Sequence, residues 1–219
     1  MTAPVLITGG AGSVGRQLTS MFLGAGRPVK IFDLPFMDFA GLEDQEGIEV
    51  VKGDITDGES VEEAVKGVGS VLHLAALLPP NSEKDKEKTF SVNVGGTKNI
   101  ADAVKLVAPE AIVVFTSSIS TYGDTSGEND PVTVDHSQSA IDIYADSKIH
   151  GERAIKDSGV KSIILRIGSI AVPAFLAPPE PWPFTAEQRV EMVHRDDVAD
   201  ALFVSADSQE SVGKVFNIA

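Results

Sequence analysis

The residues of this chain best suited to chemistry are a tyrosine and a lysine four positions apart, Tyr144 and Lys148. They fall on a segment predicted to be helical, 143–158, so they share one face of that helix. A free phenol has a pKa of about 10 and is a poor base at neutral pH. Because a neighbouring ammonium favours the phenolate, the pair suits a general acid or base that moves a hydroxyl proton. A core tyrosine beside a solvated lysine is the structural alternative.

Two serines could complete such a site. Ser117 and Ser118 follow the predicted strand 111–115. A serine hydroxyl at the end of a strand could hydrogen-bond a substrate oxygen while Tyr144 moves the proton. The tyrosine–lysine spacing alone is a common accident, and its combination with these serines and a glycine-rich turn is what favours a catalytic site.

The glycine-rich turn lies between the first predicted strand and the first predicted helix, at Gly9, Gly12 and Gly15. Glycines there let a pyrophosphate approach the backbone, and the helix N-terminus offers free N–H groups. Asp33 ends the second predicted strand, where a carboxylate would bind the adenosine ribose hydroxyls. Such a carboxylate repels a 2′-phosphate, so we expect NAD rather than NADP, although Arg27 and Lys30 lie nearby in the sequence. Asp33 as a turn residue or helix cap is the structural alternative.

The order of predicted elements indicates an α/β fold. Short β-rich runs alternate with helical segments, which is typical of a parallel sheet covered on both faces. We therefore predict a Rossmann-type doubly wound parallel sheet with a reduced C-terminal cap, as one domain over 1–219. The predicted strands are 5–7, 29–32, 48–51, 70–74, 111–115, 162–166 and 215–218, and the predicted helices are 14–23, 57–66, 86–107, 143–158 and 195–206.

One segment departs from this alternation. Five prolines fall between 173 and 183, which excludes a regular helix or a central strand. We expect 173–194 to form an irregular lid over the carboxyl ends of the strands. Within 83–88, six alternating charges predict the solvated start of a helix.

The composition of the chain excludes several classes of binding partner and of site. The 219 residues carry 18 Lys and Arg against 32 Asp and Glu, a net charge of -14, which argues against nucleic-acid or anionic-membrane partners. The absence of cysteine excludes disulfides, thiolate zinc sites and a cysteine nucleophile. No His, Asp and Glu cluster has metal-ligand spacing, so we expect no metal. No apolar stretch has the length of a membrane span and no signal peptide is evident, so a cytoplasmic location is expected.

Several longer motifs give the chain a family resemblance. It resembles the extended short-chain dehydrogenase/reductase family, the group that includes NAD-dependent sugar epimerases and dehydratases. The stretches that carry the resemblance are 8–15, 53–57, 73–76, 93–97, 117–118 with 122–123, 144–148 and 193–199.

The resemblance implies roles for individual residues. Tyr144 would be the catalytic acid or base, and Lys148 would hold the nicotinamide ribose and lower the Tyr144 pKa. Ser118 matches the residue that hydrogen-bonds the reacting oxygen, with Ser117 the less favoured choice. Asp54 and Ile55 match the adenine site, although Asp54 as a turn residue and Asn93 as a buried amide stay open. The expected cofactor-binding residues are Gly9, Gly12, Ser13, Val14, Gly15, Asp33, Asp54, Ile55, Leu74, Ala75, Ala76, Asn93, Tyr144, Lys148 and Ile167.

The chain also departs from the family pattern. Nucleotide-sugar epimerases carry Arg-x-x-Asn and then Gly-Pro after the sixth strand, whereas here Ser169 follows Arg166 at that spacing and no glycine precedes Pro173. The Arg-Ile-Gly-Ser run looks more like uronate dehydrogenases. The chain stops at Ala219, where family members continue with a lobe that grips the nucleotide half of the substrate. We therefore expect a small sugar, sugar acid or other secondary alcohol as substrate.

The predicted function is an NAD-dependent oxidoreductase or epimerase-type reaction that moves a hydride between nicotinamide and a secondary alcohol or ketone carbon. The alternatives are a nucleotide-sugar epimerase or dehydratase with a truncated substrate lobe, a non-catalytic dinucleotide-binding sensor, and a piece of a longer enzyme. The family resemblance also implies a homodimer through helices 86–107 and 143–158.

Four further residues have mostly structural interpretations. We expect His73 to be structural, Tyr122 to form part of the pocket wall and Asp197 to cap a helix. Arg195 could pair with a substrate carboxylate or with Asp196.

Overall fold

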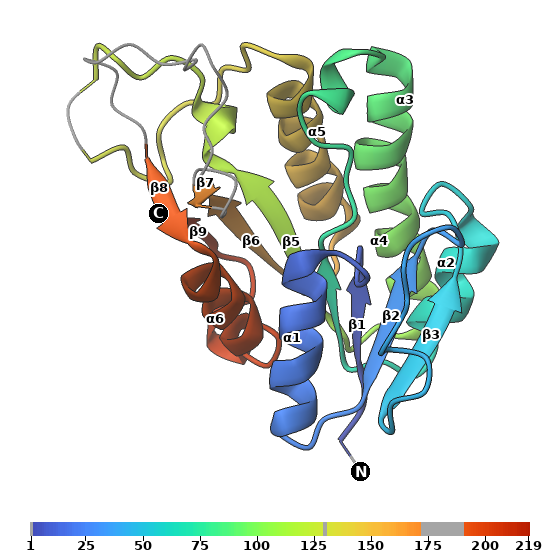
Figure 1. Ribbon diagram of the computed structural model, residues 1–219. Helices are drawn as coiled ribbons and strands as arrows, with labels where there is room; N and C mark the ends of the chain where they lie inside the picture. The colour runs from blue at the N-terminus through green and yellow to red at the C-terminus, as the bar shows by residue number, and fades with distance from the viewer. Residues whose placement is uncertain (1, 129–130, 172–190) are drawn as a thin grey trace.

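The fold is built on a seven-stranded parallel sheet in the order β3-β2-β1-β4-β5-β6-β9, seen in a computed structural model that describes residues 2–128, 131–171 and 191–219 (Figure 1). This confirms the predicted doubly wound parallel sheet. The chain leaves β1 for one half of the sheet and β4 for the other, so a crevice opens between these two strands at their carboxyl ends. The strands are β1 Val5–Thr8, β2 Val29–Asp33, β3 Ile48–Lys52, β4 Ser70–His73, β5 Ile112–Ser118, β6 Ser162–Ile167 and β9 Val215–Ile218.

Helices cover both faces of the sheet. Figure 1 shows α1 and α6 on one face and α2, α4 and α5 on the other. The strands are apolar on both sides because both sides are buried, and Val5 and Ile7 pack toward α1 while Leu6 packs toward α2 and α4. The helices are α1 Ser13–Gly24, α2 Gly58–Val65, α3 Lys86–Phe90, α4 Gly96–Val107, α5 Ile143–Ser158 and α6 Arg195–Ser205.

Most helix ends follow from local chemistry. Asp57 caps α2 by accepting a hydrogen bond from the Glu59 backbone N–H. Helix α5 ends at Gly159, whose φ of 76° suits a glycine after a helix. The prediction that Asp197 caps α6 is wrong, because His194 is the capping residue and accepts from the Asp196 N–H at 3.2 Å. A strand leads straight into this helix, so α6 begins before Asp197.

The predicted helix 86–107 is interrupted. Helix α3 ends at Phe90, a π-helical turn occupies Ser91–Gly95, and α4 begins at Gly96. A π-turn inserts one residue into the helical register, which turns Asn93 away from the direction that an uninterrupted helix would give it. An apolar periodicity spread over 22 positions does not reveal such an insertion.

The end of the predicted lid is a strand. β8 Met192–His194 pairs in parallel with β7 Ser169–Ala171 to form a small second sheet. The proline-rich part of the predicted lid, 173–190, lies outside the described residues. Among the helices that the structure describes, none is both long and apolar enough to cross a membrane.

Candidate active site

The glycine turn forms a close-packed cradle at the start of α1. Gly9 has a φ of 69°, and a Cβ there would lie 3.1 Å from the Ala75 backbone nitrogen. A Cβ on Gly15 would lie 2.6 Å from the Gly10 backbone. Gly12 caps α1 without a side-chain acceptor, and the first turn, which includes Ser13 and Val14, has no acidic residue. The first-turn N–H groups therefore suit a pyrophosphate, which is what the predicted NAD would present.

Asp33 lies at the mouth of this cradle. One carboxylate oxygen accepts from the Ala11 N–H at 3.0 Å, and the other accepts from the Leu34 N–H at 2.9 Å. Each oxygen keeps a lone pair for a further donor, so the side chain fits the ribose hydroxyls.

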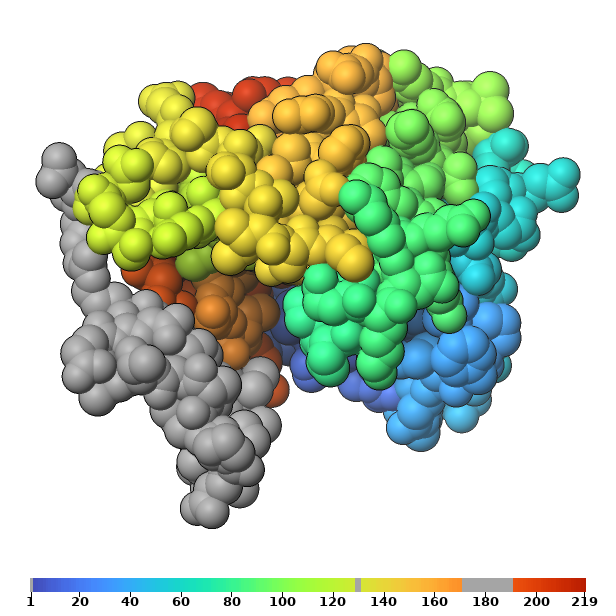
Figure 2. All heavy atoms as spheres, turned by 90° about the horizontal axis from the view of Figure 1, so that it is seen from above, coloured from blue at the N-terminus to red at the C-terminus, as the bar shows by residue number. Residues whose placement is uncertain are grey.

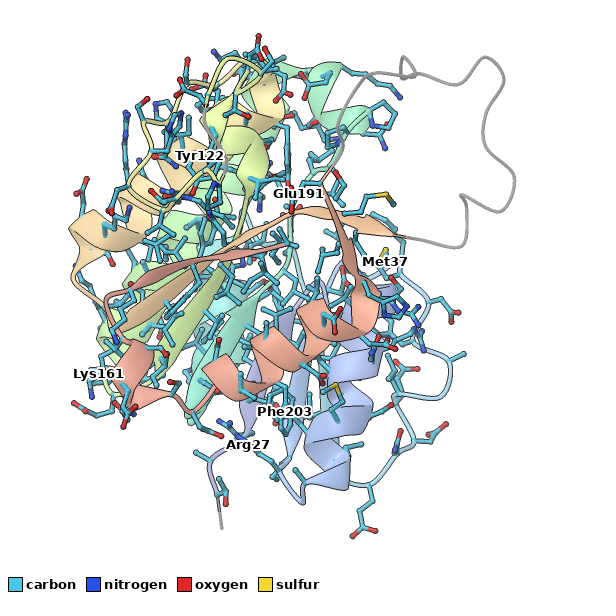
Figure 3. The ribbon with its side chains drawn as sticks, turned by 90° about the vertical axis from the view of Figure 1, so that its left-hand side faces the viewer. Arg27, Met37, Tyr122, Lys161, Glu191 and Phe203 are labelled. Carbon is cyan, nitrogen blue, oxygen red and sulfur yellow. The ribbon has the colours of Figure 1, made fainter. Side chains whose placement is uncertain are left out.

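The basic residues near Asp33 in the sequence do not face it. Figure 3 shows Arg27 at the opposite end of the sheet, where its guanidinium binds Asp207 at 2.8 Å. The Lys30 ammonium bonds the Lys66 carbonyl at 3.1 Å. Arg16, which the sequence reasoning missed, bonds the carbonyls of Ala11, Asp38 and Ala40 and so holds the loop after β2 against the glycine turn. Arg27 and Lys30 are therefore not positioned to favour a 2′-phosphate.

The expected adenine residues differ in what they offer. The Asp54 side chain accepts from both the N–H and the hydroxyl of Thr56, so it holds a turn. Asp54 also lines a cavity of about 340 Å³. Ile55 is buried against Gly96, where a Cβ would come within 2.7 Å of it. Its side chain therefore belongs to the core, and its backbone is what an adenine could contact.

The segment after β4 forms the wall opposite the glycine turn. It runs through Leu74, Ala75 and Ala76, and the Ala75 N–H donates to the Thr8 hydroxyl at 3.1 Å. The Asn93 amide holds this wall from behind, accepting from the Leu77 N–H at 2.7 Å and donating to the Leu77 carbonyl at 3.0 Å. With protein partners on both amide atoms, Asn93 fits the buried-amide interpretation.

Two of the predicted catalytic residues, Tyr144 and Lys148, lie side by side on α5 next to β5, the strand that Ser118 ends. Lys148 is buried, its ammonium donates to the Thr116 carbonyl at 2.8 Å, and it lies 5.6 Å from the centroid of the Tyr144 ring. Ser118 ends β5 on the strand side opposite Ser117, because side chains alternate along a strand. The Ser117 hydroxyl donates to Glu152 at 2.6 Å inside the core, which leaves Ser118 as the serine that can serve the site. Ile167 pairs with Ser118 at the end of β6.

The surroundings set the pKa of each catalytic group. Burial, aided by the Asp142 carboxylate, raises the pKa of Tyr144 to about 12. Burial therefore outweighs any effect of Lys148 on this phenol, and the expected lowering of the Tyr144 pKa by Lys148 stays a prediction. Burial lowers the pKa of Lys148 to about 8, and Glu152 opposes that shift. Lys148 consequently keeps its proton at neutral pH, but only narrowly.

Comparison with known proteins decides the family. The chain matches the model of the "NAD dependent epimerase/dehydratase family" over residues 5–219. It belongs to this family. The 3-beta-hydroxysteroid dehydrogenase of Mycolicibacterium neoaurum is 32% identical over 157 residues, which cover 69% of this chain and 42% of that protein. The D-erythronate dehydrogenase of Cupriavidus necator is 32% identical over 183 residues, which cover 77% of this chain and 55% of that protein.

Solved structures share the fold. The epimerase Mth375 of Methanothermobacter thermautotrophicus has a TM-score of 0.87 at 25% identity and covers 99% of this chain and 71% of its own. The Bordetella bronchiseptica enzyme WbmG in complex with NAD has a TM-score of 0.83 at 24% identity, over 100% of this chain and 73% of its own. Since the chain spans only 42% and 55% of the length of these two curated relatives, the position of Ala219 carries no argument about the substrate. The likeness to uronate dehydrogenases stays a prediction, as do the homodimer and the cytoplasmic location.

A carboxylate that the sequence analysis did not single out, that of Glu83, supports the helix that carries Tyr144 and Lys148. Glu83 accepts from the backbone N–H groups of Ile143 at 2.9 Å and Tyr144 at 3.0 Å, so it caps α5 from another part of the chain. Burial pulls the other way, but these bonds and one from Ser82 hold the pKa of Glu83 below its usual range. The predicted solvated segment 83–88 is confirmed as exposed, but the bonds from Glu83 to α5 were not predicted, since a partner 60 residues away leaves no local sequence signal.

Two further expectations have clear outcomes. His73 is structural, as predicted, because it is buried and both ring nitrogens bind threonine hydroxyls. Tyr122 is not simply a pocket wall, because its hydroxyl donates to Asn217 at 2.6 Å and accepts from Arg166 at 2.8 Å. Figure 3 shows Tyr122 above the carboxyl end of the sheet, where this network holds the segment after β5. The Arg195 Nε atom lies 3.9 Å from the Asp196 carboxylate, and its role toward a substrate stays a prediction.

Proposed function

We propose that this chain binds NAD across the carboxyl edge of its sheet and acts on a carbon that bears a hydroxyl group. NAD, when bound, supplies a hydride acceptor or donor at its nicotinamide ring. The observation that supports the proposal is that Tyr144 and Lys148 lie together beside the carboxyl end of β5, where Ser118 is, at the edge that also holds the glycine cradle. Figure 2, which views this edge from above, shows the blue N-terminal turn between the green segment after β4 and the orange segment after β6.

Each side chain has a distinct task in this proposal. Tyr144 moves the hydroxyl proton, and Ser118 hydrogen-bonds the reacting oxygen. Lys148 holds the nicotinamide ribose, and its ammonium favours the phenolate of Tyr144, whose pKa is otherwise raised by burial. The Thr116 carbonyl fixes the Lys148 ammonium at the site.

The favoured substrates are secondary alcohols such as a small sugar or sugar acid. Among the relatives, one is named for a hydroxysteroid and another for D-erythronate, a hydroxy acid. What these names share is a dehydrogenase acting on a hydroxylated compound. An epimerase would use the same residues for two successive half-reactions, so turnover has to separate the two.

A non-catalytic sensor is the competing function. A sensor needs the glycine cradle, Asp33 and a lysine to hold the nicotinamide ribose, but it has no use for a residue that moves a hydroxyl proton. The presence of Tyr144 beside Lys148 therefore favours the enzyme over the sensor.

The test is turnover by the Tyr144→Phe variant. We would incubate the chain with NAD and a panel of a 3β-hydroxysteroid, an aldonic acid and a nucleotide sugar, and follow NADH absorbance. Loss of a general acid or base costs at least about 100-fold, so Y144F should lose that much turnover while NAD binding by calorimetry is kept. Full turnover by Y144F would overturn the mechanism. NAD binding without turnover of any panel member would favour the sensor.

A further inference from the structure

A buried imidazole that the proposed mechanism does not use connects the glycine turn to the cofactor wall. His73 ends β4, and its Nδ1 lies 2.8 Å from the Thr8 hydroxyl oxygen at the end of β1. The same hydroxyl oxygen accepts from the Ala75 N–H. On its other side, His73 Nε2 lies 3.0 Å from the Thr97 hydroxyl on α4. One imidazole therefore joins two strands and a helix.

The hydrogen bonds continue from α4 to the catalytic helix. The Thr97 hydroxyl donates to the Asn93 carbonyl at 2.6 Å. The Asn93 amide nitrogen donates to the Ser147 hydroxyl at 2.9 Å, and that hydroxyl donates to the Tyr144 carbonyl at 2.7 Å. An unbroken path thus runs from Thr8, beside Gly9, to the backbone of Tyr144. Figure 1 shows the elements that this path joins, with β1 and β4 in the sheet and α4 and α5 on its face.

The partners of His73 fix its protonation. A backbone carbonyl can only accept, so the Thr97 hydrogen points at Asn93 and the Thr97 oxygen must accept from His73 Nε2. The Thr8 hydrogen then has His73 Nδ1 as its acceptor. The imidazole is therefore neutral, with its proton on Nε2. A second proton on Nδ1 would face the Thr8 oxygen and leave the Thr8 hydrogen without this acceptor.

Burial makes this path sensitive to any single break. Thr8, His73, Asn93, Thr97 and Ser147 are each no more than 2% exposed. The Phe115 ring packs beside His73 at a centroid distance of 5.8 Å, and the Lys148 ammonium is the charged group that acts on the imidazole. Water cannot replace a lost partner in such a place, so the remaining groups must shift to find new ones.

We propose that His73, as the neutral Nε2-protonated imidazole, is a positioning residue that keeps the cofactor wall at Ala75 in register with the backbone of Tyr144. The part of this proposal that concerns turnover rests on the proposed function. The parts tested by NAD binding and by NMR spectroscopy do not depend on turnover. If the path only filled the core, breaking it would lower stability alone. If it positions the two parts of the site, breaking it also weakens NAD binding and slows turnover.

Thr97 is the cleanest place to break the path, because Thr97→Val removes the hydroxyl without changing the side chain's shape. Thr97→Ser keeps the hydroxyl. Thr89→Val is the matched control, since Thr89 is equally buried and bonds the Ser82 carbonyl at 2.8 Å but lies off the path. We would measure the NAD dissociation constant by calorimetry, kcat, and the thermal midpoint for each variant.

We expect T97V to weaken NAD binding and to lower kcat, each by about 10-fold, and T97S to recover most of both. T89V should lose thermal stability to a similar extent with NAD affinity and kcat unchanged. Loss of stability alone in T97V, at temperatures where it is folded, would overturn the proposal. If no tested alcohol turns over, the proposed function fails, but the NAD dissociation constants of T97V, T97S and T89V still test the role of His73. The two failures can therefore be told apart.

Nitrogen-15 NMR of labelled histidine gives a readout that needs no ligand. The His73 signal is assigned as the one absent from a His73→Phe spectrum. We expect a bare Nδ1 and a protonated Nε2, unchanged between pH 7 and pH 5, where an ordinary imidazole becomes charged. A proton on Nδ1, or a charged His73 at pH 5, would contradict the proposal.

Discussion

Lys148 keeps a positive charge in surroundings that disfavour it. Its ammonium has the Thr116 carbonyl as a neutral partner, and the rings of Phe115 and Tyr144 lie 5.1 and 5.6 Å away. The counter-charge of Glu152 opposes the effect of burial without cancelling it, so the pKa of Lys148 stays near 8. A charge held this way costs folding free energy and persists where function uses it.

Replacing Lys148 should therefore make the protein more stable and less active. In the unfolded chain a lysine binds its proton up to a pKa of about 10.5. Since the folded pKa is about 8, the unfolded state binds more protons between these values, and stability rises with pH through that window. At pH 7 the charge thus lowers the unfolding free energy, and Lys148→Met should raise it by up to about 3 kcal/mol while abolishing turnover.

Chemical denaturation at pH 7 and pH 10 checks this prediction. The wild type should gain stability between the two pH values relative to K148M. Lys105→Met, a change of the same kind at an exposed position on α4, should leave both stability and activity near the wild type. A K148M variant less stable than the wild type at pH 7 would contradict the prediction.

At the scale of elements, the sequence predicted what depends on neighbours along the chain. The strands and α5 follow from the alternation of β-rich runs with helical segments. Tyr144 and Lys148 follow from their spacing on a helix, and Ser118 follows from the family resemblance. What it could not predict depends on distant partners. The π-turn at Ser91–Gly95 serves Asn93, which reaches the Leu77 backbone, and Glu83 caps a helix that begins 60 residues later.

Glu83 gives the element scale its prediction. A carboxylate accepts from two N–H groups at once, whereas an amide offers one acceptor oxygen and turns a donor toward the second N–H. Glu83→Gln should loosen the first turn of α5, which carries Tyr144, and lower kcat by about 5-fold, in keeping with the loss of a helix cap. The NAD dissociation constant should stay within about 2-fold, because the glycine cradle does not involve this turn.

Glu87→Gln is the control for this test. It makes the same change of charge in the first turn of α3, and we expect wild-type kinetics from it. Equal losses of kcat in E83Q and E87Q would show that the lost charge, rather than the cap on α5, is responsible.

At the scale of the whole molecule, the helices on both faces pack against one sheet, and the central strands of that sheet carry buried polar groups. His73 is the titratable member at the β1–β4 junction, and burial, with the Lys148 charge as a smaller cause, lowers its pKa to about 3. An unfolded chain gives this imidazole a pKa of about 6.5. As pH falls below that value, the unfolded state takes up a proton that the folded state does not, so stability falls with pH.

His73 should therefore contribute to the acid sensitivity of the fold between pH 7 and pH 5. The linkage amounts to about 1.4 kcal/mol per pH unit below about pH 6.5, or about 2 kcal/mol at pH 5. His73→Gln cannot take up the proton, so its unfolding free energy should fall by about 2 kcal/mol less than the wild type's over this range, measured by urea denaturation. The net charge of -14 is the same in both proteins at neutral pH, so general charge repulsion cancels in the difference. His150→Gln, at a half-exposed position on α5, should keep the wild-type fall, and an equal fall in H73Q would show that His73 does not stay neutral in the folded protein.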